Sequence, residues 1–153
     1  MTQATIRARI KTVIDTVSNK GQTHDYFRWV IDESEFLDIA ATTISTVKQV
    51  RVWLIDYVGF AAETPWISRS ANARRVHTFI LHGYLGLDDS AETAKTMAVL
   101  AEAVCDALDA DATLNSSATS SSRVPCQLDM ADVMWYSKLC HHATIALAVA
   151  EIV

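Results

Sequence analysis

Large and small side chains alternate along the last segment of the chain, Leu139–Val153, and this pattern constrains the fold more than any other. One face of an extended strand here carries large aliphatic side chains: Leu139, Ile145, Leu147 and Val149. The other face carries smaller ones: Cys140, Thr144, Ala146, Ala148 and Ala150. Because successive side chains of a strand point to opposite faces, the large face is predicted to join a core. The small face would let a helix or a neighbouring subunit approach the sheet closely.

Three further segments have the character of strands. Val47–Phe60 is rich in β-branched and aromatic residues, and these occupy both of its faces. Val76–Leu87 repeats the pattern, with large apolar side chains on both sides. Such strands are typical of a sheet that is buried on both sides. Gln127–Tyr136 is predicted to be the strand that precedes the last one, joined to it at Ser137-Lys138.

Helical spacing of apolar residues is clearest after Leu87. Asp89 or Ser90 is predicted to cap a helix there, and its apolar stripe comprises Met97, Leu100, Ala101, Val104, Cys105 and Leu108. A first helix is predicted from one apolar face near the start of the chain: Ile6, Ile10, Val13, Ile14 and Val17. A weaker helix is predicted from Glu33 to about Thr46. The expected fold is α+β, with a mostly antiparallel sheet of about four strands packed against two or three helices.

Length and composition favour one globular domain over residues 1–153. Half of the 153 residues are hydrophobic, and no apolar run approaches the length of a membrane span or a signal sequence. The chain is therefore expected to be made in a reducing cytoplasm, with its three cysteines as free thiols. A net charge of −5 argues against a general nucleic-acid binder. The Ser/Thr-rich stretch Thr113–Ser122 is predicted to be a mobile loop.

Residues that could carry chemistry do not fall at productive spacings. Cys140-His141-His142 is the densest cluster, but adjacent strand residues point to opposite faces, as His77 and His82 also do. Cys105 lies on the apolar helix stripe, where a buried thiol is usually inert. The four glycines form no phosphate-binding loop. No catalytic residue, cofactor or metal ligand is therefore assigned, and the chain is not expected to be an enzyme.

The sequence has one concentration of basic residues, between two predicted strands. The segment Glu63–Arg75 contains Trp66, Arg69, Arg74 and Arg75. A solvated loop is one interpretation of this segment. The other is a subunit or tube interface, because arginine and tryptophan are enriched at interface hot spots and a long loop is usually functional. The residues alone leave both interpretations open.

Several segments, taken in order, resemble a known family: HDYFRW at His24–Trp29, the strand Val50–Ile55, HTFILHGY at His77–Tyr84, Asp88-Asp89-Ser90 before a helix ending in AVLAEAVCDAL, and LCHHATIALAVAE at Leu139–Glu151. The succession resembles the small tail terminator, or tail completion, proteins of long-tailed bacteriophages, particularly those of Mu-like and related siphophages. The resemblance covers roughly residues 24–153, mainly 76–108 and the last strand. These are patterns of residues and not catalytic signatures.

The resemblance implies a structural virion protein. Its copies would form a ring, a hexamer, that caps the head-proximal end of the tail tube and meets the head–tail connector or head completion protein. The subunit would be made in the host cytoplasm and end at the head–tail junction, with DNA passing through the lumen without sequence-specific binding. No membrane partner is implied. Two alternatives stay open: a head-completion or connector protein of the neck, and a small-molecule-binding α+β domain that uses His and Cys groups.

Overall fold

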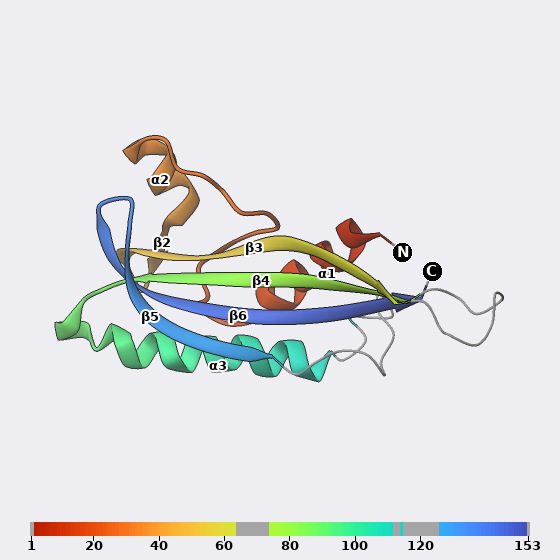
Figure 1. Cartoon of the computed structure of the whole chain (residues 1–153). Helices are drawn as coiled ribbons and strands as arrows, with labels where there is room; N and C mark the ends of the chain where they lie inside the picture. Colours follow the sequence, from red (N-terminus) through yellow and green to blue (C-terminus); the bar gives the residue numbers. More distant parts are fainter. Residues whose placement is uncertain (1, 64–73, 112–113, 115–125, 153) are drawn as a thin grey trace, which may run out of the picture.

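A long, twisted β-sheet forms the centre of the structure (Figure 1). The computed structural model describes residues 2–63, 74–111, 114 and 126–152. Its elements in chain order are α1 (Gln3–Asp15), β1 (Gln22–His24), α2 (Glu33–Ala40), β2 (Ala41–Ile44), β3 (Val47–Glu63), β4 (Arg74–Gly86), the short 3₁₀ helix η1 (Asp89–Ala91), α3 (Thr93–Ala110), β5 (Gln127–Trp135) and β6 (Lys138–Ile152).

The strands lie in the order β1-β3-β4-β6-β5, and β2 pairs with the first part of β3. Within the described residues the sheet therefore has six strands, and it is mixed because β1 runs parallel to β3. The other pairings are antiparallel. The prediction of a mostly antiparallel sheet of about four strands is wrong, although the fold is α+β overall and carries three α-helices in this part of the chain.

Both strands that the sequence failed to indicate are short. β1 has three residues, too few for an alternating pattern to show. β2 lies where the second helix was predicted to continue to about Thr46, but α2 ends at Ala40. The next residues are Thr42, Thr43 and Ile44, whose branched side chains favour strands, and β2 pairs with β3 through them. The long-range pairing therefore overrides a weak helical pattern.

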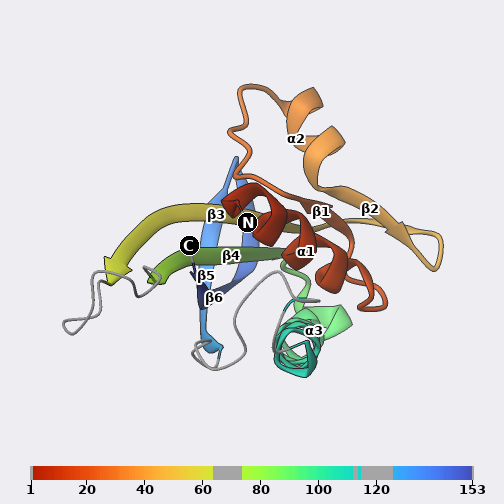
Figure 2. The same cartoon turned by 90° about the vertical axis from the view of Figure 1, so that its right-hand side faces the viewer.

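One face of the sheet, called here the helical face, packs against α1 and α3. Most of the predicted stripes are confirmed, because Ile6, Ile10, Val13 and Ile14 of α1 and Met97, Leu100, Ala101, Val104 and Leu108 of α3 are all buried. The two exceptions are Val17, which follows the end of α1, and Cys105, and both are only partly buried. They meet large side chains of the central strands: Trp53, Ile55, Phe79, Leu81, Leu85, Ile145, Leu147 and Val149. Figure 2 shows α3 below the sheet and α2 above it.

The start of α3 differs from the prediction by a few residues. Asp88 takes the capping role, because its carboxylate accepts hydrogen bonds from Ser90 Oγ at 2.7 Å and from Ala91 N at 3.3 Å. It caps η1, after which Glu92 adopts a left-handed conformation and α3 begins at Thr93. The prediction that Asp89 or Ser90 caps the helix is therefore wrong. No helix in the described ranges is both long and apolar enough to span a membrane.

Candidate functional site

Among the described residues, helical cover on the second face of the sheet is confined to one end. There α2 places Phe36, Ile39 and Ala40 against buried residues of the strands: Val52, Leu54, Tyr84 and Cys140. Beyond this cover, alternate positions of β4 and β6 continue along the same face, with Thr78 opposite Ala148 and Ile80 opposite Ala146. We call this part the bare face, formed by Val76, Thr78, Ile80, Thr144, Ala146 and Ala148. None of these six residues is fully buried, although β4 and β6 are interior strands of the sheet.

The composition of the bare face matches the prediction made from the last strand. The large side chains of β6 at Ile145, Leu147 and Val149 are buried under the helices, and its small ones point the other way. The bare face is thus a smooth surface of Ala, Thr, Val and Ile side chains. No described residue of this face carries a charge at its centre, although Asp56 and Asp129 flank it at positions opposite Ile80 and Thr144.

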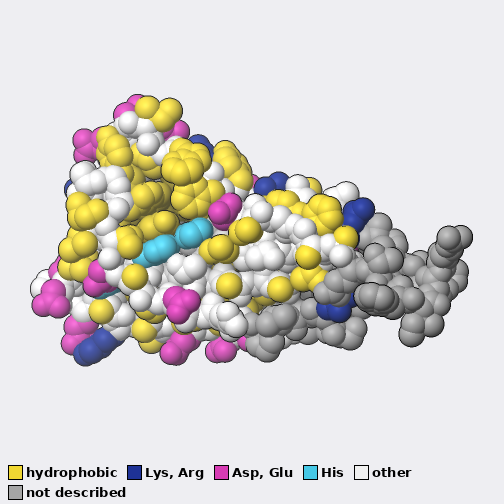
Figure 3. Space-filling view, viewed as in Figure 1, with side chains coloured by type: hydrophobic (Ala, Val, Ile, Leu, Met, Phe, Trp, Pro, Cys, Tyr) yellow, Lys and Arg dark blue, Asp and Glu magenta, His cyan; other side chains and the backbone are white. Residues whose placement is uncertain are grey.

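Two histidines lie where the covered end meets the bare face. His82 Nδ1 is 3.1 Å from His142 Nε2, and the two rings are nearly parallel at 6°. Tyr84 stacks on His142 with ring centroids 4.5 Å apart, and Phe27 meets His82 edge-on. Figure 3 shows histidine side chains in a hollow bordered by apolar side chains.

These histidines favour their neutral forms. Burial lowers the pKa of His82, and the nearby charge of Asp56 opposes this only in part. Burial and the neighbouring His82 lower the pKa of His142. The neutral rings can share one hydrogen bond, in which one nitrogen donates and the other accepts. In the described part of the chain, no group of three or more His, Cys, Asp or Glu side chains converges as metal ligands would.

The basic residues predicted between the strands fall in different places. Trp66 and Arg69 lie outside the described residues, as does most of Thr113–Ser122. Arg74 and Arg75 are the first two residues of β4 and therefore point to opposite faces. Arg75 lies over the ring of Phe60 at 5.3 Å, and its Nη1 is 3.8 Å from the buried carboxylate of Glu151.

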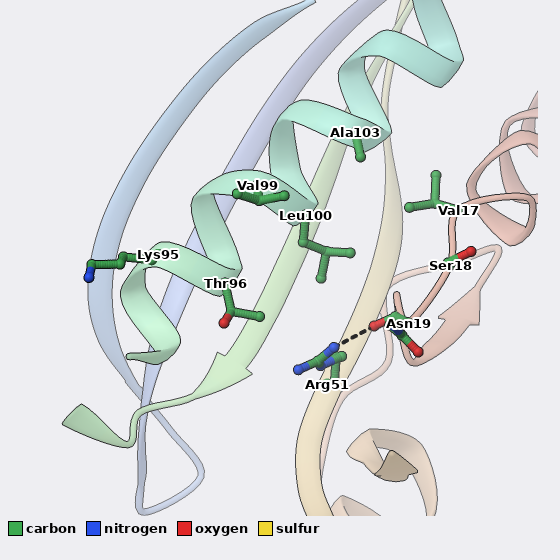
Figure 4. Close-up of a pocket in the computed structure, with 9 residues that line it drawn as sticks. All are labelled: Val17, Ser18, Asn19, Arg51, Lys95, Thr96, Val99, Leu100 and Ala103. Atoms are coloured by element: carbon green, nitrogen blue, oxygen red, sulfur yellow. Dashed lines mark hydrogen bonds between the residues drawn. The ribbon is translucent and has the colours of Figure 1, made fainter. Parts of the chain in front are cut away.

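A further site lies on the helical side, between α3 and the turn that follows α1 (Figure 4). It is a pocket of about 480 Å³ whose walls are mainly apolar, with Val17, Val99, Leu100 and Ala103 among its lining residues. Arg51 of β3 lies at one end of it. A second hollow, against the turn between β2 and β3, shares Arg51 and Thr96 with this pocket. The guanidinium therefore lies between two recesses of the surface.

Arg51 is only 7% exposed, and the chain around it explains why. Gly21 crosses β3 so closely that a Cβ on it would lie 2.0 Å from the carbonyl oxygen of Arg51. Its φ of 87° also favours glycine, which lets the turn close over the strand. Arg51 Nη1 donates to the carbonyl oxygen of Asn19 at 2.7 Å, and Nη2 donates to Gln49 Oε1 at 3.1 Å.

Within the part of the chain that the structure describes, the partners of the Arg51 guanidinium are neutral oxygens. Its Nε has no hydrogen-bond partner, and among the described residues no carboxylate contacts its guanidinium. Burial lowers the pKa of this group, which shows that desolvation disfavours its charged form. Sequence reasoning did not single out Arg51, although a lone cation within the apolar run Val50–Ile55 was a visible signal.

Comparison with known proteins assigns no relative to the chain. No protein family matches the sequence, and a search of curated proteins returned no match.

Proposed function

We propose that the protein is a structural subunit of a bacteriophage tail, a tail terminator whose copies form a hexameric ring. The ring would cap the head-proximal end of the tail tube, stop tube growth and meet the head–tail connector. The segments that carry the resemblance support this proposal because they form the centre of the fold: His77–Tyr84 lies within β4, Leu139–Glu151 within β6, and the helix between them is α3.

The bare face is the observation that carries the proposal. Sheets in globular domains are stable when each apolar face packs against another layer. An antiparallel sheet can face water on one side, but its outward positions are then usually polar. Here the outward positions of two interior strands are Val, Ile, Ala and Thr. On the neighbouring β3, Val58 lies at the register shift between Tyr57 and Gly59 and adds an exposed apolar side chain, at 57% exposure.

A neighbouring protein surface would supply the missing layer. The face is built from small side chains, so a partner can approach its backbone closely. In a ring, each copy uses two different patches of its surface to contact its two neighbours. The net charge of −5 fits a conduit that does not hold DNA phosphates.

A tube-growth assay tests the proposal. Tail tube protein from the same particle is polymerised with and without this chain, and tube lengths are measured by electron microscopy. A terminator gives shorter tubes of narrower length distribution, because it stops growth at one end. Tubes of unchanged length at saturating amounts of the chain would refute the proposal.

A matched pair of variants connects the assay to the bare face. Ala146→Glu places a charge at the centre of this face, where the side chain can reach water in the free subunit, and is expected to abolish capping. Ala8→Glu makes the same change at an exposed position of α1 and should leave capping intact. Circular dichroism establishes that both variants are folded. Equal capping by the two variants would exclude the bare face as the contact.

A further inference from the structure

The pocket at Arg51 has the chemistry of a site for a carboxylate attached to an apolar group. A guanidinium carries five N–H donors, and Arg51 uses two of them within the chain. Holding such a charge away from water without a counter-ion is costly, and an arriving carboxylate relieves this cost. The walls beside it are apolar, and Val99 at the rim is 67% exposed. We call this pocket the socket.

The same chain presents a surface of matching chemistry. Residues 29–33, called here the knob, precede and begin α2. Two large apolar side chains in this segment are almost fully exposed, Trp29 at 81% and Ile31 at 84%. Glu33 follows them and is also exposed. Few ordered segments expose two such side chains so fully unless a partner covers them.

The knob is held in a defined shape and does not project as a loose end. The Asp32 carboxylate accepts a hydrogen bond from Glu35 N at 2.8 Å, which caps α2. The Glu35 carboxylate accepts one from Ile31 N at 3.0 Å, which fixes the entry to the helix. Trp29 packs edge-on against Phe27, with ring centroids 5.3 Å apart. A preformed knob loses little conformational entropy when it binds.

We propose that the knob of one copy of this chain binds in the socket of the next copy, with Trp29 and Ile31 against its apolar wall and Glu33 paired with Arg51. This inference rests on the proposed function, because the knob and socket would form the contact between neighbouring subunits of the proposed ring. Charge complementarity favours a second copy of the chain as the occupant, because the same chain carries an acidic, apolar knob and a cationic pocket whose described lining residues include no carboxylate.

The two surfaces lie on different parts of the molecule. The knob belongs to the α2 side of the sheet, and the socket lies between α3 and the turn after α1, on the helical side (Figures 2 and 4). One patch therefore meets a different patch on the next copy. Such a head-to-tail contact generates a closed ring when the rotation between copies divides a full turn.

A mixing experiment tests the head-to-tail contact. Trp29→Ala removes the knob's main anchor and leaves the socket intact, while Arg51→Gln disables the socket and leaves the knob intact. Each variant alone is expected to associate at least about 30-fold more weakly than the wild type. Mixed in equal amounts, they retain one good knob and one good socket. The mixture should therefore form a species of two 16.8 kDa chains and no larger ring in sedimentation velocity.

Control variants separate loss of contact from loss of charge or fold. Arg7→Gln removes a positive charge from α1, and Met134→Ala removes an exposed apolar side chain from β5, so both should assemble like the wild type. Val99→Glu and Val99→Lys change the exposed rim of the socket without touching Arg51. With an acidic knob, the glutamate should weaken assembly at least about tenfold more than the lysine. This pair tests the socket even if Arg51→Gln fails to fold.

The results also separate this contact from the proposed function. Assembly by Trp29→Ala and Arg51→Gln equal to that of the wild type, or no two-chain species on mixing, would overturn the contact. So would a wild-type chain that shows no association of copies, either alone at about 100 µM or at tube ends. Rings that depend on knob and socket but do not stop tube growth would leave the contact standing and refute the terminator.

Discussion

Replacing Gly83 by alanine tests the packing at the centre of the sheet. Gly83 lies on β4 opposite Trp53 of β3, and the indole ring lies across the glycine. A Cβ at this position would lie 2.7 to 2.9 Å from three ring atoms of Trp53. Trp53 is 1% exposed and belongs to the core under α1 and α3, so the ring cannot move away without disturbing its neighbours.

The expected cost follows from two opposing effects. Overpacking a well-filled core typically costs about 1–3 kcal/mol. Alanine also restricts the unfolded chain more than glycine does, which offsets about 0.4–1 kcal/mol of that cost. The net expectation for Gly83→Ala is a loss of about 1–2 kcal/mol in the free energy of unfolding. For a chain of this size it corresponds to a fall in Tm of about 2–8 °C.

Gly86→Ala is the matched control on the same strand. The nearest atom to the new Cβ would be Val50 Cβ at 3.5 Å, an ordinary contact, so only the effect on the unfolded chain applies, and the free energy of unfolding should rise by about 0.4–1 kcal/mol. Urea denaturation at low protein concentration measures both variants, and the m-value should not change. A Gly83→Ala protein as stable as the wild type would refute the packing argument.

Two further predictions concern the histidine pair and the β5–β6 turn. The pKa values of His82 and His142 are lowered by burial, so the folded state takes up protons less readily than the unfolded chain. The contribution of this pair to the free energy of unfolding should therefore be fully present above about pH 6.5 and should be lost as the pH falls through the lowered pKa values. His142→Gln should make this loss smaller in urea titrations between about pH 7 and 5. The same loss in the variant as in the wild type would contradict the prediction. Ser137 has a φ of 59° in the tight turn after β5. Because glycine adopts a positive φ more easily than serine, Ser137→Gly should raise the free energy of unfolding by about 0.5–1 kcal/mol. A lower Tm in this variant would show that the turn is not strained.

The long strands and the two main helices could be predicted from the sequence because their patterns extend over many residues. The alternation identified the core-facing side chains of β6 at Ile145, Leu147 and Val149, although Leu139 is 46% exposed, and the stripe from Met97 to Leu108 identified the buried face of α3. Local patterns failed where pairing over a long distance decides the structure. β1 and β2 are too short to carry a pattern of their own, and both form because they pair with β3.

The candidate surfaces were predicted less completely, for a physical reason. The small face of β6 was visible because it depends on one strand. The socket combines β3, the turn after α1 and α3, and no local pattern brings these together. Trp29 stood out in the sequence only as the last residue of the HDYFRW segment, because the exposure of Trp29 and Ile31 depends on how the chain enters α2. Arg75 was predicted in a loop, yet it lies in β4 near Glu151.

Imaging of tail tubes mixed with the purified protein shows whether this chain is a tail terminator. Averaged views of the tube ends, taken by electron microscopy, show whether the chain adds a ring and at which end. We expect a sixfold ring at one end of each tube, with the opposite end unchanged. Tube ends that look the same with and without the protein, or density distributed along the tube walls, would contradict it.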